Sequence, residues 1–165
     1  MKATIEAKLV TAMKADSDLD GIAVFCRGLY IYPPRNWYPL AEVFIPDESQ
    51  TSRGTGGFVY NEFVGFIQVS VRIPDKPAVT DREAVVSSYT SVQSYVSEIL
   101  LALGTPALLD LDTLTRADGL EVVMSFEMAD QDSISYGIES RDRLGDNFNN
   151  FGIVPFRVET REDRS

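Results

Sequence analysis

A long stripe of apolar residues constrains the fold more than any other feature of the sequence. Its members recur at steps of three and four residues, which places them on one face of an α-helix. They are Val85, Tyr89, Val92, Tyr95, Val96, Ile99, Leu100 and Leu103. Thr80 and Glu83 form a capping box at the start, and Gly104 and Pro106 end the pattern. We predict a helix over residues 81–103 that lies with its apolar face on a sheet.

A shorter stripe predicts a second helix over residues 2–15. The apolar side chains fall on one face, and the charged ones are left to water. The apolar members are Ile5, Leu9, Val10 and Met13, and the charged members are Glu6, Lys8 and Lys14.

Alternation of apolar and polar residues predicts the strands. The clearest run is 58–73, and together with residues 41–45 it encloses the segment 46–57, for which we predict a long polar loop. In residues 120–128 the predicted apolar face consists of Leu120, Val122, Met124, Phe126 and Met128. Further strands are expected at 22–26, 29–32, 108–116 and 151–158, with an irregular segment at 130–150 and a frayed charged tail at 159–165.

The order helix, strands, helix, strands predicts an α+β fold. We expect a mostly antiparallel or mixed sheet of five to seven strands with two main helices packed on it. A chain of 165 residues is long enough for one compact domain, so residues 1–165 are expected to share one core.

Charge and composition restrict the function. The net charge of -10 disfavours binding to a nucleic-acid backbone, because such affinity depends on Lys and Arg. The sequence contains no histidine, which removes the usual general base and every Ser-His-Asp arrangement. We therefore predict a protein that is not an enzyme, with no catalytic residue, cofactor or metal.

Other general features agree with a cytosolic site of synthesis. No apolar run reaches the roughly 20 residues of a membrane span, and the N-terminus lacks the pattern of a secretion signal. Cys26 is the only cysteine, which excludes an internal disulfide, and its neighbours Val24 and Phe25 indicate a small buried hydrophobe rather than a reactive thiol.

The stretch from Asp16 to Gly21 resembles the first half of a calcium-binding EF-hand loop. Asp16, Asp18 and Asp20 take positions 1, 3 and 5 of that motif, and Gly21 takes position 6. Arg27 stands where a bidentate glutamate is required, and a β-like segment follows instead of a helix. These departures exclude an EF-hand and leave a helix exit with solvated aspartates, or an irregular oxygen site.

Three further features are candidates for function. The run Arg53, Gly54, Thr55, Gly56, Gly57 precedes a strand rather than a helix, so it fits a mobile interaction loop or an inert hairpin tip better than a phosphate cradle. Trp37 and Tyr38 suit either a protein contact or the core. Asp110 and Asp112 lie two residues apart, and a metal-dependent enzyme built on such carboxylates is the enzymatic alternative.

The order of these elements resembles that of the tail terminator proteins of long-tailed, siphovirus-type bacteriophages and of related neck and tail-completion proteins. The resemblance covers most of residues 2–158. It rests on the N-terminal helix, on Tyr38-Pro39 leading into Leu40-Ala-Glu-Val-Phe-Ile45, on the polar loop before Phe66-Ile-Gln-Val-Ser-Val-Arg72, on the helix over 81–103 and on the terminal Phe156-Arg-Val158.

The resemblance implies a structural protein of the virion. Such a subunit forms a homo-oligomeric ring, expected to be a hexamer, that caps the tail tube, ends tail polymerisation and joins the tail to a head-closure or connector protein. DNA would pass through the ring without sequence-specific binding, and assembly would occur in the host cytoplasm. A different head–tail connector is the alternative within this class. The loop at Arg53–Gly57 would supply ring or tube contacts.

Overall fold

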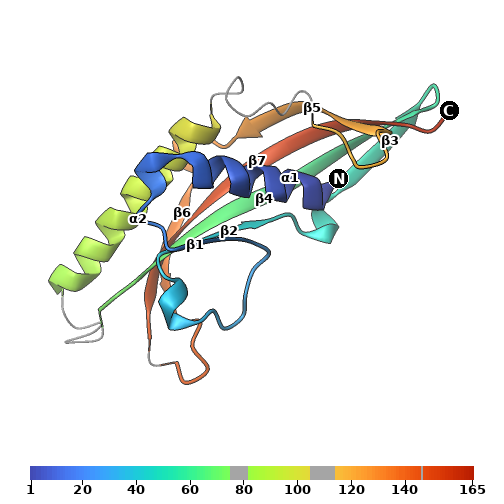
Figure 1. The fold of residues 1–165 in the computed structure, drawn as a ribbon. Coiled ribbons are helices and arrows are strands. Elements are labelled where there is room, and N and C mark those ends of the chain that lie inside the picture. Colours follow the sequence, from blue (N-terminus) through green and yellow to red (C-terminus); the bar gives the residue numbers. More distant parts are fainter. Residues whose placement is uncertain (75–81, 105–113, 146) are drawn as a thin grey trace.

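Two long central strands organise the sheet. The computed structural model describes residues 1–74, 82–104, 114–145 and 147–165. Strands β4 (Phe58–Arg72) and β7 (Asn149–Asp163) each have 15 residues and pair antiparallel over their whole length. At about 3.4 Å per residue, each strand is about 50 Å long. This ribbon runs from the helices to the end marked C in Figure 1.

Shorter strands flank both sides of this ribbon. The remaining strands are β1 (Val24–Arg27), β2 (Leu40–Phe44), β3 (Thr51–Thr55), β5 (Glu121–Met128) and β6 (Ser135–Glu139). Strands β2 and β3 follow one another along β4, while β5 and β6 share the outer side of β7. Only the pairing of β1 with β2 is parallel among these pairs of described strands. The predicted α+β class with a mixed sheet is thus confirmed, with seven strands.

Two helices cover one face of the sheet. Helix α1 (Lys2–Ala15) and helix α2 (Arg82–Leu103) match the predicted ranges; Thr80 and Asp81 lie outside the described residues. The described part of the chain also contains four single 3-10 turns: η1 (Ser17–Leu19), η2 (Arg35–Trp37), η3 (Asp47–Ser49) and η6 (Gln131–Ser133). The predicted stripes supply the core, which includes the fully buried Ile5, Leu9, Met13, Ile99 and Leu103.

One charged residue of α1 does not face water as predicted. Glu6 is only 8% exposed, because its Oε2 accepts a hydrogen bond of 3.1 Å from the buried N–H of Ile45. Its Oε1 lies 3.5 Å from Arg27, so the carboxylate ties α1 to β1 and to the end of β2.

The predicted loop over 46–57 is wrong. Residues Thr51–Thr55 form β3, which pairs with the first part of β4 and turns into it at Gly56 and Gly57, whose φ angles are 57° and 84°. All five residues of β3 are exposed, so neither of its faces is marked by apolar side chains. The sequence therefore lacks the alternation that would identify this strand.

The predicted apolar face of β5 is wrong in its first half. The pairing with β7 shifts between Val123 and Ser125, which leaves Met124 as a β-bulge. Before the bulge, Glu121 and Val123 are buried, while Met124 is 52% exposed. After the bulge, Phe126 and Met128 pack on the core as predicted.

The C-terminal third contains more strand than predicted. Residues Ser135–Glu139 form β6 within the segment expected to be irregular, and residues 159–163 continue β7 instead of fraying. The turn before β5 is a hairpin tip, with a bridge between Thr115 and Val122 and with Gly119 at a φ of 74°. Most of the predicted strand 108–116 lies outside the described residues. Residues 29–32, also predicted to be a strand, do not form one.

Within the described ranges, neither α1 nor α2 has the length and hydropathy required to span a bilayer.

Candidate interaction surface

The sheet continues past both helices as an arm (Figure 1). We define the arm as β3, residues 58–62 of β4, residues 121–123 of β5 and residues 159–163 of β7, which pair side by side. β3 is the outermost strand on one side, where its backbone groups have no neighbouring strand among the residues that the structure describes. Open strand edges of this kind pair readily with other chains.

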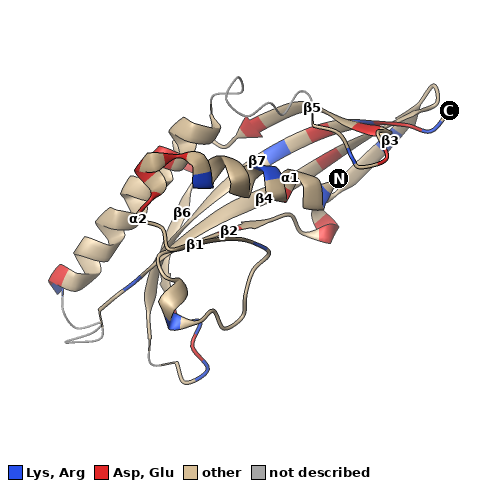
Figure 2. Ribbon diagram, viewed as in Figure 1, with Lys and Arg blue, Asp and Glu red and all other residues tan. Residues whose placement is uncertain are grey.

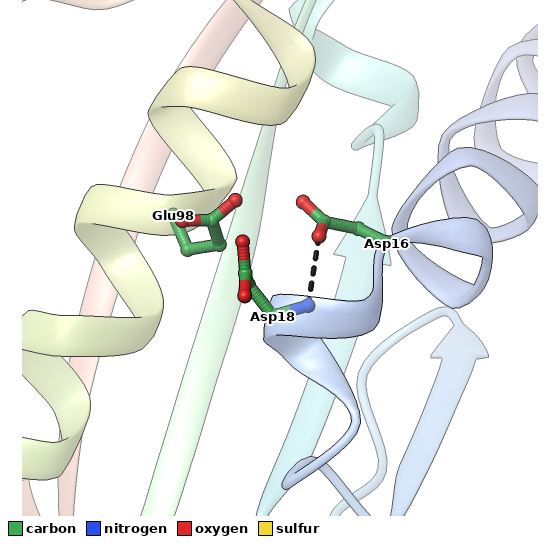
Figure 3. Close-up of side chains that lie close together, drawn as sticks. All are labelled: Asp16, Asp18 and Glu98. Atoms are coloured by element: carbon green, nitrogen blue, oxygen red, sulfur yellow. Dashed lines mark hydrogen bonds between the residues drawn. The ribbon is translucent and has the colours of Figure 1, made fainter.

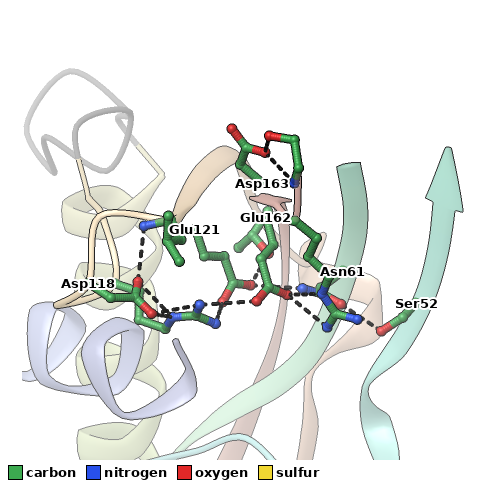
Figure 4. Close-up of polar contacts among 11 residues, drawn as sticks. Ser52, Asn61, Asp118, Glu121, Glu162 and Asp163 are labelled. Carbon is green, nitrogen blue, oxygen red and sulfur yellow. Dashed lines mark hydrogen bonds and ion pairs between the residues drawn. The ribbon is translucent and has the colours of Figure 1, made fainter. Parts of the chain in front are cut away.

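A buried polar network stiffens the base of the arm (Figure 4). Glu121 is 2% exposed, and its Oε1 accepts hydrogen bonds from Thr160 and, at 2.9 Å, from Asn61. Its Oε2 accepts one of 3.1 Å from Arg116, which also donates to Glu162 at 3.0 Å. The network links β4, β5, β7 and the turn before β5, so these strands are held together at the base of the arm by side-chain hydrogen bonds as well as by backbone pairing.

The predicted contact residues Arg53–Gly57 lie at the tip of the arm. The Arg53 guanidinium stands 5.8 Å from the centre of the Tyr60 ring, a cation–π contact. Both residues line a groove of about 460 Å³ that also includes Met124 and Glu159. Of the two alternatives for this run, a mobile interaction loop and a hairpin tip, the structure has the hairpin tip.

Two loops cover the opposite end of the sheet, on the face that carries no described helix. Residues 28–39 and the described residues 140–145, 147 and 148 are joined by Arg141, which donates two hydrogen bonds to the carboxylate of Glu42 and two to the Tyr30 carbonyl, one of them 3.0 Å long. Glu42 is fully buried and also accepts a 2.8 Å bond from the Tyr30 N–H. Burial lowers the pKa of Arg141, but the hydrogen bond and charge of Glu42 outweigh it and the net pKa is raised.

Four arginines meet in a cavity of about 300 Å³ between these loops. We call this the arginine pocket, and its cationic residues are Arg35, Arg72, Arg141 and Arg143. Arg35 and Arg72 both donate to the side-chain oxygen of Asn147, the second at 2.7 Å. The Arg143 guanidinium is exposed and lies 5.3 Å from the centre of the Tyr32 ring.

One acceptor in this pocket has no partner. Asn149 is 3% exposed, and its Oδ1 has no hydrogen bond to any residue in the described part of the chain. Its Nδ2 donates to the Tyr38 hydroxyl at 3.3 Å. A buried carbonyl oxygen without a donor costs about 1–3 kcal/mol, so a donor from a water or from a partner would stabilise this end of the molecule.

The predicted aromatic contacts are half-buried beside the pocket. Trp37 packs edge-on against Tyr30 with ring centres 5.0 Å apart, and Tyr38 lines the pocket wall. Burial raises the pKa of Tyr38. The exposed apolar side chains are instead their neighbours Ile31, Tyr32 and Leu144, of which Ile31 is 77% and Leu144 79% exposed.

The aspartates of the calcium-like motif form part of an acidic cluster on the helix face of the sheet (Figure 3). Asp16 and Asp18 meet Glu98 of α2, with carboxylate oxygens of all three within 4.8 Å of one another. A hydrogen bond with Asp16 raises the pKa of Glu98, as do partial burial and the charges of both aspartates. The strand β1 follows this motif, which agrees with the exclusion of an EF-hand.

Glycine at position 21 has a packing role that the motif did not suggest. A Cβ at Gly21 would stand 2.4 Å from the Tyr95 hydroxyl, so a larger residue there would force the Tyr95 side chain of α2 to shift. Asp110 and Asp112, the basis of the enzymatic alternative, lie outside the described residues.

No protein-family model matches the chain, and no curated protein matches it.

The sequence did not reveal the arginine pocket because its members are far apart along the chain. Arg35 and Arg141 are brought together only by the pairing of β2, β4 and β7. The run Ser140-Arg-Asp-Arg143 was a local signal, since it concentrates positive charge in an acidic chain.

Proposed function

We propose that this chain is a structural protein of a bacteriophage tail or neck that assembles into a ring of identical subunits, expected to be six. The ring caps the tail tube, ends its polymerisation and presents a surface to the head-closure or connector protein. DNA passes through the ring without sequence-specific binding.

The observation that carries this proposal is the arm. It projects past the helices and offers an open edge on which all five residues are exposed, while the buried network around Glu121 keeps it rigid. A preformed strand edge can extend the sheet of a neighbouring subunit with little loss of conformational freedom.

The face without a helix gives further support. Apolar side chains on it are only half-buried, among them Phe44, Phe66 and Ile153, and Val64 is 40% exposed. Together with Ile31, Tyr32 and Leu144, they provide the apolar and aromatic surface that subunit interfaces use.

A shortened arm tests the proposal. Arg53 pairs with Tyr60 and Gly54 with Val59, so deleting these four residues together shortens the hairpin by two pairs and keeps the facing direction of every other side chain. We expect the variant to keep the circular dichroism spectrum of the wild type and to lose ring assembly in native mass spectrometry. Intact rings from the folded variant would overturn the role of the arm.

A further inference from the structure

We propose that the arginine pocket of one copy binds the acidic cluster Asp16, Asp18 and Glu98 of a second copy. This inference rests on the proposed ring and names one contact that would build it. The pocket lies on the face without a helix, where Arg72 and Asn149 are paired neighbours on β4 and β7, and the acidic cluster lies on the helix face.

Charge selects an acidic partner for the pocket. Four of the 15 Lys and Arg residues line this cavity together with one carboxylate, Asp142, and Glu42 pairs with Arg141, so the pocket keeps an excess of positive charge in a chain whose net charge is -10. Figure 2 shows basic residues at the two loops, interrupted by an acidic segment in one of them, and acidic residues where α1 meets α2. Guanidinium groups bind carboxylates through two parallel hydrogen bonds, the geometry that a lysine cannot offer.

The surroundings of the pocket favour a protein over a nucleic acid. Ile31, Tyr32 and Leu144 form an exposed apolar rim beside the arginines. Tyr and Arg are the residue types enriched at the centres of protein interfaces, whereas the overall negative charge of the chain repels a phosphate backbone.

This contact would remove two unfavourable features of the isolated chain, an unsatisfied buried oxygen and the repulsion between three carboxylates. The oxygen Asn149 Oδ1 is buried without a hydrogen-bond donor among the described residues, and an acidic segment that enters the pocket brings the exposed Ser17 hydroxyl, a hydrogen-bond donor, with it. Three carboxylates within 4.8 Å repel one another, and cationic side chains of a partner offset that repulsion.

The positions of the two surfaces favour a closed ring over a pair. They lie on opposite faces of the sheet, so each copy presents one surface to its predecessor and the other to its successor. A contact between two different surfaces repeats around a circle and closes when the rotation permits, whereas a symmetric dimer uses the same surface twice.

A charge exchange tests the contact. Arg143 is exposed, and Glu98 lies on the outer part of α2, so neither substitution removes a core side chain. We expect Arg143→Glu and Glu98→Arg each to weaken ring assembly about tenfold or more, measured as the dissociation constant by mass photometry. We expect the double variant to recover an affinity within about threefold of the wild type, because the charges are complementary again.

Arg82→Glu, an exposed charge reversal at the start of α2, is the matched control and should leave assembly unchanged.

Each outcome decides one point, provided that circular dichroism shows every variant to be folded. If the wild type forms rings that neither single substitution weakens, the contact is wrong and the proposed function stands. If both single variants are weakened and the double variant is not restored, the pairing of these two surfaces is wrong. A wild type that stays monomeric at all concentrations overturns the proposed function and this inference with it.

Discussion

Glu42 shows how a single residue holds the loops at one end of the sheet together. Its carboxylate is fully buried on the face without a helix, and Arg141 and the Tyr30 N–H satisfy its oxygens. Because the loop that carries Arg141 also carries Arg143, this ion pair helps to hold Arg143 beside the pocket. No sequence motif predicted the pair, since its members are separated by 99 positions.

Removal of Arg141 should destabilise the fold more than any exposed ion pair would. Arg141→Ala leaves the Glu42 charge buried with a single donor, so we expect a loss of about 3–5 kcal/mol in the free energy of unfolding, measured by urea denaturation. Asp47→Ala is the control, because the Asp47 side chain is 92% exposed in its ion pair with Lys2 and should contribute little. Equal stability of the two variants would contradict the role of the pair.

Cys26 should react slowly at neutral pH. Burial, followed by the negative charge of Glu42, raises the pKa of the Cys26 thiol from 9.0 to about 11. Since only the thiolate attacks, its reactive fraction at pH 8 falls about 100-fold. We expect the rate of reaction with iodoacetamide to rise with pH to a midpoint near 11 in the folded protein. A midpoint near 9 in the folded protein would rule out the raised pKa, because steric protection alone slows the reaction without moving the midpoint.

At the scale of elements, the sequence predicts the helices and strands that pack on the core. It does not predict the strand segments that extend beyond the core. Both helices and the core half of β4 carry one apolar face, and their positions were predicted. β3 and the last residues of β7 belong to the arm, where both faces meet solvent or polar groups such as Thr160, so alternation disappears. Because of the bulge at Met124, the side chains in the first half of β5 point to the face opposite to the one predicted by strict alternation. A regular alternating pattern in the sequence cannot reveal such a bulge.

Gly65 in β4 should be sensitive to a single added methyl group. A Cβ there would stand 2.5 Å from the Phe156 ring, 2.8 Å from Ile45 and 2.9 Å from the Phe44 carbonyl. We expect Gly65→Ala to lower the free energy of unfolding by about 1–3 kcal/mol through overpacking. Gly54→Ala in β3 is the matched control, since the nearest atom lies 3.7 Å away, and should change stability by less than about 0.5 kcal/mol. Similar effects of both substitutions would contradict the packing described around β4.

At the scale of the whole molecule, the two ends of the sheet offer different kinds of contact. The arm presents backbone groups along an open edge, whereas the loop end presents arginines with an apolar rim. A subunit with unlike surfaces at separate places is suited to a head-to-tail ring, in which each surface meets a different neighbour. The net charge of -10 agrees with the proposed ring, because acidic side chains along its channel would repel DNA rather than bind it.

The mass of the purified, full-length protein in native mass spectrometry tests this account most directly. Measured over a range of concentrations and joined with electron microscopy of the same sample, it should give six times the mass of one chain and ring-shaped particles. A protein that remains monomeric at every concentration, or that forms only symmetric dimers, would contradict the account.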